Sequence, residues 1–578
     1  MQTRREFVSS SLGALFGALA GGPFISNARA ARPILGLPPG CDTGALPLDP
    51  TRPLWASPLT PKPMMIGGMP FAPWFTGDAF PDNHIPFHSA ENVFPHGMPR
   101  ATERVKVAVV GGGLSGLTTA YLLRRFKPVV FELRERFGGS AQGEIWDDSP
   151  YSLGGAYVIT PDPGTFLHMI YHNLGLHQVV RVDEDPLTVE LNGKVLPDFL
   201  KGAGFKPDEL PALDAYLAVV DRMANQWYPD VPFDAPWMIA LDQKTFKQDI
   251  EDQMGLPVPP LLADAIQAYC YSSFGGGWEE ISAASGWNFL AAEEFGRWVF
   301  PGGNAYMADR LWQKLADLDR HIPAGCSPTH VRGGCRAVDV RMAPSGLVQV
   351  TYKDRDGSLR AIEAERVVLA NSKHIVKHML FDLERLDPAK YNAMLNLEYR
   401  AYAVANVLLD REIERDFYDI FLLRDGNFPQ DVGAARGYFR PTDALDGSFT
   451  PSHLPPQPGA RNVLTFYWPL AYPQGRFELI LHEPYQRFGE GLTTMLREET
   501  LPLLGLPESA VREIRMTRWG HALPLAKPGF IATGKPQELL RPFEGRVYFV
   551  NQDNWALPAV ENCLFDAHNV ADEIASDL

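Results

Sequence analysis

The apolar positions of residues 105–132 predict a strand, a helix and a second strand in quick succession. Val105–Val110 is an apolar run interrupted only by Lys106, which is typical of a parallel strand buried on both faces. Residues 117–126 place their apolar side chains at helical spacing, and Pro128–Phe131 is a second apolar run. This order of elements predicts the α/β class, with helices packed on a parallel sheet.

Apolar runs elsewhere predict further elements. Strands are expected at 337–340, 348–352, 366–370, 399–409, 463–468 and 545–550. Helical periodicity is expected after Asn304 to about residue 318, and from about 559 to 574. Residues 31–104 are dense in Pro and Gly and keep no period, so we expect an extension that is either irregular and wrapped over the body or partly disordered.

Three glycines lie between the first strand and its helix. Gly111, Gly113 and Gly116 have the G-x-G-x-x-G spacing, which permits a tight turn, a close approach of backbone to a pyrophosphate, and close helix–strand packing. The helix N-terminus offers unpaired N–H groups to the phosphates. Glu132 ends the second strand, where an acid accepts hydrogen bonds from an adenosine ribose. We interpret this unit as a dinucleotide site; the alternative is a glycine turn in a purely structural unit.

Composition and charge exclude several classes of protein. Among 578 residues, 45% are hydrophobic and 21% charged, which excludes disorder of the whole chain. The formal net charge of −16 offers no diffuse positive field, so we expect neither nucleic acid nor an anionic membrane as a partner. Five cysteines without a C-x-x-C pair predict no disulfide scaffold, and we predict no metal site.

The first thirty residues have the pattern of an export signal. Arg4-Arg5 precede an apolar stretch from Val8 to about Gly22, and Ala28-Arg29-Ala30 offers a cleavage site. The paired arginines are typical of a twin-arginine signal, which would deliver a folded, cofactor-loaded enzyme to the periplasm or beyond through the twin-arginine export machinery. The alternative is a membrane anchor, but the stretch is shorter than the ~18–20 residues of a span, and we expect no transmembrane segment elsewhere.

Two further groups of residues leave alternatives open. His84, His88 and His96 lie in the extension, where they could bind a haem or a metal, although isolated loop histidines usually do neither. Cys326 and Cys335 flank an expected turn, and in an oxidising compartment they would pair or remain free thiols.

Residues 132–139 distinguish flavin from nicotinamide enzymes. Glu132-Leu133-Arg134-Glu135-Arg136-Phe137-Gly138-Gly139 resembles the E-x-x-x-x-x-G-G extension of FAD enzymes of the flavin amine oxidase and phytoene desaturase superfamily. Leu153–Tyr157, Pro301–Asn304 and Asn551–Asn554 resemble further landmarks of that superfamily. The resemblance implies a discontinuous Rossmann-like FAD-binding domain with an inserted substrate domain of mixed sheet and helices. The FAD-binding domain would comprise 105–160, 291–379 and 516–578, and the substrate domain 161–290 and 380–515.

The resemblance also implies which residues contact FAD. These are Gly111, Gly113, Leu114, Ser115, Gly116, Glu132, Arg134, Gly138, Gly139, Ser140, Gly155, Ala156, Val338, Asp553, Ala559 and Val560. The N-terminus of the last helix would stabilise the reduced flavin by its dipole. Ser140 stands where the superfamily has an arginine or another polar residue, so an arginine–phosphate contact is lost or supplied elsewhere. A covalent flavin link through Cys563 is improbable.

Candidate catalytic residues are His521, Trp519 and Trp555. Trp519 and His521 are expected near the isoalloxazine ring, with Trp555 stacking at its edge and His521 either a base or an ordinary hydrogen-bonded imidazole. Many amine oxidases have a lysine near N5, but Ala405 occupies the best-matching position here.

Other aromatic and charged side chains that could belong to a substrate site are expected to have structural roles. Tyr467 and Trp468 are expected in the core, Glu293 and Glu294 in a solvated acidic turn, and Lys373-His374 with Lys377-His378 on a basic helix face.

The expected activity is oxidation of an amine C–N bond by hydride transfer to flavin N5. Short stretches such as Thr517–His521 are similar to bacterial spermidine dehydrogenases, which implies a polyamine or a related amine as substrate. Electrons would pass to a quinone, a haem protein or oxygen, and a bound haem is possible. The alternatives are a desaturase or isomerase of an unsaturated lipid or carotenoid, and a binding subunit on an FAD fold.

Overall fold

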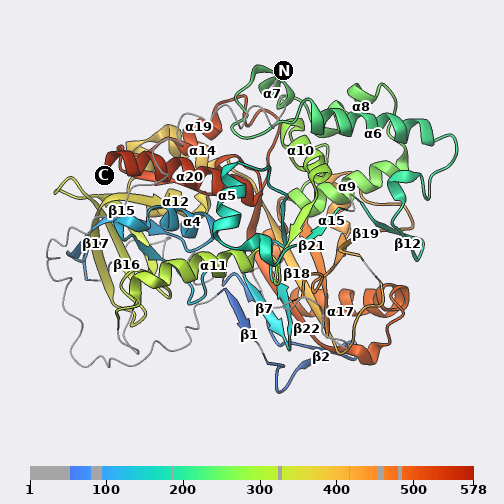
Figure 1. The fold of residues 1–578 in the computed structure, drawn as a ribbon, viewed down its shortest axis with the longest axis horizontal. Helices are drawn as coiled ribbons and strands as arrows, with labels where there is room; N and C mark the ends of the chain where they lie inside the picture. Colours follow the sequence, from blue (N-terminus) through green and yellow to red (C-terminus); the bar gives the residue numbers. More distant parts are fainter. Residues whose placement is uncertain are drawn as a thin grey trace.

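The structure is a computed structural model that describes residues 53–56, 58–79, 94, 96–184, 187–322, 328–415, 417–451, 461–479 and 484–578. The predicted export signal, His84, His88 and Cys326 lie outside the described residues. Within them, two large sheets lie side by side, each with its own helices (Figure 1).

The first sheet contains the predicted strand–helix–strand unit. Its strand order is β14-β6-β5-β17-β16-β15, and β23 pairs with β17. The bounds are β5 Ala101–Val110, β6 Val129–Phe131, β14 Val331–Arg332, β15 Arg336–Met342, β16 Val348–Lys353, β17 Leu359–Leu369 and β23 Val547–Phe549. Strands β14, β6, β5, β17 and β23 are parallel neighbours, and β15, β16 and β17 are antiparallel. The predicted strands therefore all form, and β17 is longer than expected.

Strand β5 is apolar throughout its second half because both faces of the sheet are covered. Val107 and Val109 pack with α4 (Leu114–Leu122), α11 (Ala305–Ala316) and α20 (Val560–Asp577). Ala108 and Val110 point the other way, into a core shared with helices α12 (Lys373–Met379) and α14 (Pro388–Leu395). Alternate side chains of one strand thus serve two cores, as expected for a parallel sheet between helical layers.

The second sheet has strand order β12-β11-β19-β20-β21-β18-β22-β3-β2, with β4 paired to β22, within the described residues. The bounds are β2 Met64–Ile66, β3 Met69–Phe71, β4 Thr76–Gly77, β11 Val189–Leu191, β12 Lys194–Leu196, β18 Tyr399–Leu409, β19 Asp419–Arg424, β20 Asp443–Asp446, β21 Asn462–Leu470 and β22 Val511–Pro524. Strand β22 belongs wholly to this sheet, so it crosses the domain boundary that we placed at residue 516.

Helices cover both faces of this second sheet (Figure 1). One group comprises α6 (Leu210–Asn225), α7 (Pro236–Leu241), α8 (Phe246–Met254), α9 (Pro260–Phe274) and α10 (Ala283–Leu290). Helix α17 (Pro484–Met495) packs on the other side, against Ala401, Ala403 and Ala405 of β18. The shorter helices are α5 Phe166–Asn173, α13 Leu383–Leu386, α15 Val432–Gly437, α16 Gly475–Glu478, α18 Leu501–Leu503 and α19 Lys535–Leu540.

Two smaller sheets complete the fold. One has the order β10-β13-β9, with bounds Arg181–Asp183, Arg297–Val299 and Tyr157–Ile159. The other has the order β1-β7-β8, with bounds Leu54–Ala56, Gly143–Trp146 and Ser149–Ser152.

The N-terminal extension is less irregular than its composition suggested. Strand β1 pairs with β7, while β3 and β4 pair with β22 and β2 pairs with β3. Each of these strands has only two or three residues, which is too short to show a period in the sequence. The strands of the extension are therefore built into the edges of two sheets.

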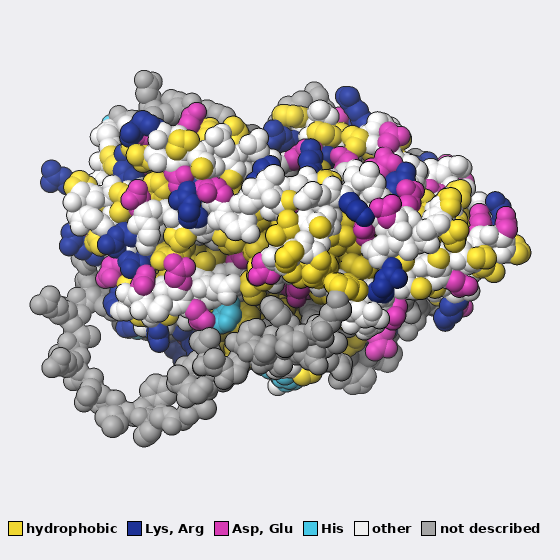
Figure 2. All heavy atoms as spheres, turned by 90° about the horizontal axis from the view of Figure 1, so that it is seen from above, with side chains coloured by type: hydrophobic (Ala, Val, Ile, Leu, Met, Phe, Trp, Pro, Cys, Tyr) yellow, Lys and Arg dark blue, Asp and Glu magenta, His cyan; other side chains and the backbone are white. Residues whose placement is uncertain are grey.

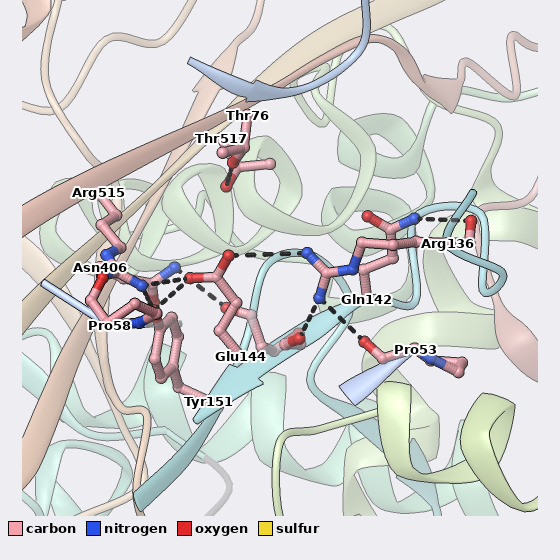
Figure 3. A network of polar contacts seen from close by, with 12 residues as sticks. Pro53, Pro58, Thr76, Arg136, Gln142, Glu144, Tyr151, Asn406, Arg515 and Thr517 are labelled. Carbon is pink, nitrogen blue, oxygen red and sulfur yellow. Dashed lines mark hydrogen bonds and ion pairs between the residues drawn. The ribbon is translucent and has the colours of Figure 1, made fainter. Parts of the chain in front are cut away.

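A buried polar network joins the extension and the small sheet of β7 to the second large sheet (Figure 3). Arg515 of β22 donates to Glu144 of β7 at 2.8 Å, to Glu513 at 2.7 Å and to the Pro58 carbonyl at 2.8 Å. The Tyr151 hydroxyl donates to the same Glu144 carboxylate at 2.5 Å. One guanidinium thus bonds to three separate parts of the chain.

No helix in the described part of the chain is both long and apolar enough to cross a bilayer. On the face shown in Figure 2, basic and acidic side chains are interspersed, and hydrophobic side chains gather near its centre.

Replacing Arg515 by Ala is expected to destabilise the protein strongly. The change removes the cation that pairs with Glu513 and the closer of the two cations that pair with Glu144, which keeps only Arg136 at 3.6 Å, and breaking a buried ion pair costs about 3–5 kcal/mol. Arg512→Ala on the same strand is the control, because Arg512 is exposed and pairs with Asp410 at 3.8 Å. Denaturant midpoints of the two variants should differ clearly; equal midpoints would contradict the role given to Arg515.

Candidate active site

One continuous cavity of about 1260 Å³ extends from the glycine turn of the first sheet to the face of the second sheet. It exceeds the ~300–1,000 Å³ typical of sites for one small ligand. Its two ends differ in chemistry: one is lined by glycine loops and helix N-termini, the other by tyrosines and carboxyl groups.

The turn between β5 and α4 forms the first end. Gly113 is the N-cap residue of α4 and no side chain caps this helix, so its first N–H groups are left for a ligand. A Cβ at Gly116 would lie 1.9 Å from the Gly111 carbonyl oxygen, and Gly111 has φ +110°. Only glycine permits this approach of helix to turn, as the spacing predicted.

Glu132 is held in a fixed position beside that turn. Its carboxylate accepts hydrogen bonds from the backbone N–H groups of Gly112 at 2.7 Å and Arg134 at 2.9 Å. Burial raises the pKa of Glu132 above its usual range, although these N–H donors and the Arg134 charge oppose the shift. Each carboxylate oxygen keeps a lone pair for a further donor, such as a ribose hydroxyl.

The loop at Gly138–Ser140 lies directly over the glycine turn. A Cβ at Gly139 would be 3.1 Å from the Cα of Gly113, so the two loops are in close contact. The Arg134 guanidinium donates to the Gly139 carbonyl at 3.1 Å and to Asp78 at 2.9 Å. Arg134 is therefore the cation beside Ser140, where the superfamily pattern has its polar residue.

The C-terminal segment adds a second helix N-terminus. Ala559 is the N-cap of α20, again without a side-chain cap, and it lines the cavity. Asp553 lines it as well, and its Oδ2 accepts from the Ser372 hydroxyl at 3.1 Å, the Lys373 N–H at 2.8 Å and the Tyr399 hydroxyl at 2.7 Å. The residues of this end fit FAD: two uncapped helix N-termini and a buried acid face one elongated cavity.

Most of the predicted cofactor positions are brought together here. Those that line the cavity are Gly111, Gly113, Leu114, Ser115, Glu132, Arg134, Gly138, Gly139, Ser140, Gly155, Ala156, Asp553, Ala559 and Val560. Gly116 lies behind the turn, in its predicted packing position. Val338 does not line the cavity, whereas Cys335, Arg336 and Ala337 do. The register of β15 shifts between Ala337 and Asp339, which places the lining residues just before Val338.

Trp519 and His521 lie on the cavity wall, as predicted, but their contacts differ. The Trp519 indole N–H donates to the Leu153 carbonyl at 2.8 Å, which fixes the ring against the Gly154–Ala156 loop. The His521 ring stacks on His374 at 4.1 Å, and its Nε2 lies 3.2 Å from Arg476 Nη1. The guanidinium can only donate, so the Nε2 lone pair accepts from Arg476, and this contact favours the hydrogen-bonded imidazole over the base.

Trp555 was wrongly placed in the catalytic site. Its side chain is buried outside the cavity lining, its N–H donates to Asp566 at 3.0 Å, and its ring meets Phe233 edge-on. The turn at 552–554 directs it into the core rather than toward a ligand.

The expected lysine of amine oxidases has no counterpart among the described residues that line the cavity. Ala405 lies on the opposite face of β18, toward α17. Lys373 is fully buried at the start of α12, not on a solvated basic face, and burial lowers its pKa. Cys563 lines the cavity, and burial raises its pKa to about 12, which keeps it a thiol and disfavours a covalent link.

The second end of the cavity has a floor made by one face of the second sheet. Its lining residues recur at every second position on five strands: Asp419 and Phe421, Asp443, Tyr467, Tyr402 and Val404, Trp519 and His521. Tyr467 donates to the Gly154 carbonyl at 2.7 Å, and its ring meets that of Tyr402 edge-on at 5.6 Å. Sequence reasoning missed Asp419, Asp443 and Tyr402; their signal is a polar side chain inside an apolar strand.

The wall opposite contains Glu293 and Arg297. Glu293 is buried, not solvated as predicted, and accepts from Tyr157 at 3.1 Å and Tyr269 at 2.9 Å. Arg297 donates to Asp183 at 2.8 Å and lies 3.7 Å from Asp419. Glu294 is exposed.

Burial affects the protonation of the carboxyl groups at the second end of the cavity. It raises the pKa of Asp443 to about 7, and it raises the pKa of Asp419 well above its usual range, with the Asp443 charge adding to the effect. Burial also raises the pKa of Glu293. This second end of the cavity, which we call the chamber, therefore contains carboxyl groups whose charge depends on what else is bound there.

The cavity joins an end with the features of a dinucleotide site to an end lined by tyrosines and carboxyl groups, which is the arrangement of a nucleotide-dependent oxidoreductase. Residues 114–478 match the family model for flavin-containing amine oxidoreductases, and the chain belongs to this family. Membership confirms the predicted superfamily and enzyme class, and it supports FAD as the cofactor.

Individual relatives are distant. A probable flavin-containing monoamine oxidase A of Dictyostelium discoideum is 28% identical over 152 residues, 25% of this chain and 32% of that protein. An amine oxidase of Oncorhynchus mykiss is 32% identical over 25% of this chain and 28% of its own length, so the chain matches about a third of these relatives. Oxidoreductase PigB of a Serratia strain is 20% identical over 82% of this chain and 75% of its own.

Solved structures confirm the mixed α/β fold. Cyclohexylamine oxidase from Brevibacterium oxydans aligns with a TM-score of 0.57 at 18% identity, covering 82% of this chain and 99% of that one. Putrescine oxidase bound to putrescine aligns with a TM-score of 0.58, also at 18% identity, with the same coverage.

Replacing Gly116 by Ala is expected to abolish FAD retention. The new methyl group would collide with the Gly111 carbonyl, which is backbone that cannot move without opening the turn. Gly491→Ala is the control, because its Cβ would meet only the Trp468 ring at 3.6 Å, an ordinary contact. The flavin-to-protein ratio after purification measures the effect; full flavin content in Gly116→Ala would contradict this assignment.

Replacing Asp443 by Asn is expected to flatten the dependence of stability on pH. With a folded-state pKa of about 7 against an ordinary 3.8, Asp443 retains a proton that the unfolded chain releases between these values. Its contribution to the free energy of unfolding is complete below the lower value and is lost by about pH 7, on the order of a few kcal/mol.

Thermal midpoints across this pH range test the prediction, with Asp425→Asn as the control because Asp425 is exposed. The wild-type protein and Asp425→Asn should lose stability in parallel, and Asp443→Asn should lose less. Three equal slopes would show that Asp443 has an ordinary pKa.

Proposed function

We propose that the protein oxidises an amine at a C–N bond, using FAD held at the dinucleotide end of the cavity. The observation that supports this most is the chamber itself, because buried carboxyl groups and tyrosines attract a cationic amine. Membership of the flavin-containing amine oxidoreductase family supports it as well. The substrate that we propose is a polyamine or a related amine.

The side chains of the chamber would orient the amine and exclude water. FAD, when bound, supplies a two-electron acceptor at N5 for a hydride from the carbon next to the amine nitrogen. Trp519, Tyr402 and Tyr467 form the wall beside the Gly154–Ala156 loop, where that carbon would lie. The nitrogen loses its protons to solvent, water hydrolyses the resulting imine to a carbonyl compound and an amine, and the electrons pass to a quinone, a haem protein or oxygen.

The same chamber argues against an unsaturated lipid or carotenoid substrate. A hydrocarbon would cover the carboxyl groups of Asp419, Asp443 and Glu293 without offering them a hydrogen bond, which is costly.

We further propose that the enzyme is exported through the twin-arginine route and works in the periplasm or outside the cell. The support is Arg4-Arg5 with the apolar stretch and Ala28-Arg29-Ala30 that follow. A protein that folds around FAD suits a route that exports folded proteins.

Absorption of the purified protein with amines, in the absence of oxygen, tests the activity. We expect an oxidised-flavin spectrum that bleaches when a suitable mono-, di- or polyamine is added. A flavin that stays oxidised with every amine would contradict amine oxidation, and a Soret band would reveal a haem. The experiment uses the full mature chain, because strands β1, β2, β3 and β4 of the extension belong to the sheets.

A further inference from the structure

Asp419 and Asp443 lie on one face of the second sheet, on neighbouring strands. Asp443 pairs across the strands with Phe421, two residues from Asp419, so the two aspartates are diagonal neighbours. Side chains in this relation have Cα atoms about 7–8 Å apart and can converge on one group between them. Both residues line the cavity and are 8% and 1% exposed.

Each aspartate has a buried oxygen without a hydrogen-bond partner within the described chain. These atoms are Asp419 Oδ1 and Asp443 Oδ2, and the nearby Tyr418 hydroxyl is a third. The other oxygen of Asp443 accepts from the Thr442 hydroxyl, and the Ser272 hydroxyl also stabilises this carboxylate, so the side chain is anchored while Oδ2 has no partner within hydrogen-bond distance. A buried acceptor without a donor is costly, about 1–3 kcal/mol, which points to a donor supplied by a ligand.

The charges of this region do not balance. Asp183, Glu293, Asp419 and Asp443 surround one guanidinium, that of Arg297. Arg297 is directed toward Asp183, at 2.8 Å, and lies 3.7 Å from Asp419. Asp443 has no closer cation in the described structure than this one. A further positive group in the chamber would stabilise the ionised carboxylates.

The spacing between strands gives the distance from the two aspartates to the aromatic wall, where the proposed oxidation takes place. Tyr467 contacts the Gly154 carbonyl, and Asp443 is its cross-strand partner on β20. Asp419 lies one strand further, on β19. Neighbouring strands are about 4.8 Å apart, so the carboxyl groups lie about 5–10 Å from the aromatic wall along the sheet.

We propose that Asp443 and Asp419 bind a second ammonium group of the substrate, so that the protein acts on diamines or polyamines in preference to monoamines. One nitrogen lies at the aromatic wall and is oxidised, while the other replaces the missing donor and cation between the two aspartates. This inference rests on the proposed amine oxidation, because it assigns the substrate class of the same cavity.

A series of matched ligands tests the proposal on the purified holoprotein. 1,4-Diaminobutane, butylamine and 4-amino-1-butanol share a four-carbon chain and differ in whether the far end is an ammonium, a methyl or a hydroxyl group. Calorimetry without oxygen gives their dissociation constants, and flavin bleaching gives their rates of reduction. We expect the diamine to bind at least ~30-fold more tightly than either of the others, the low end of the loss seen when one partner of a buried charge pair is removed.

Variants locate this preference at the pair. Asp443→Asn should reduce the diamine-to-monoamine preference by at least ~30-fold, because it removes the charge and preserves the shape. Asp425→Asn removes a carboxylate of equal charge from an exposed position past the end of β19, and it should keep the wild-type preference. If Asp443→Asn does not accumulate as holoprotein, the wild-type ligand series alone decides.

The outcomes separate the two proposals. Equal affinity for the diamine and the monoamine would overturn the second-ammonium site while leaving amine oxidation intact. A preference that survives Asp443→Asn would overturn the assignment to these aspartates. Absence of bleaching with tight, Asp443-dependent diamine binding would contradict amine oxidation and support the binding site.

Discussion

The buried guanidinium of Arg515 joins the small sheet of β1, β7 and β8 and the N-terminal extension to the second large sheet. It bonds to Glu144, Glu513 and the Pro58 carbonyl, so it connects the edge of the cofactor domain, a long strand of the second sheet and the N-terminal extension. A buried ionic network tolerates little displacement, because a separated charge loses its partner in a medium of low dielectric constant. The positions of β7 and the extension on β22 are therefore held by side chains that do not line the cavity.

The two ends of the cavity use opposite electrostatics for different ligands. At the first end, the N-termini of α4 and α20 present unpaired N–H groups and positive dipole ends, which suit an anionic pyrophosphate and an electron-rich ring. At the second end, carboxyl groups outnumber the single guanidinium of Arg297, which suits a cation. Burial of these carboxyl groups destabilises the unliganded protein, and the same carboxyl groups would select a cationic ligand. A cationic ligand removes that cost, so binding and stability are linked.

The cofactor end of the cavity was predicted well from the sequence, because its main residues are close together in the chain. The strand, glycine turn, helix and acid lie within about thirty residues, so turn geometry and periodicity largely determine their arrangement. The strand that contains Val338 and the last helix were also predicted, because each is a continuous pattern of apolar residues in the sequence. The errors at Val338 and Trp555 arise from a register shift and a short turn, which redirect side chains without changing the elements.

The chamber was less accessible to sequence reasoning because its residues meet only in the folded sheet. Asp419 and Asp443 each look like an isolated acid in an apolar strand until β19 and β20 pair. Likewise, the strands of the extension are too short to form a pattern, and pair only because the edges of β7 and β22 are available.

Asp78 connects two segments of the cavity wall that are far apart in the sequence, so the cavity is complete only when both segments are present. Its carboxylate accepts from Arg134, early in the chain, and from the N–H of Gly520, near its end. Closing loops of this length is entropically expensive, and contacts between distant residues form late in folding. A nascent chain on the ribosome therefore has no complete cavity until the segment around Gly520 has been synthesised and released.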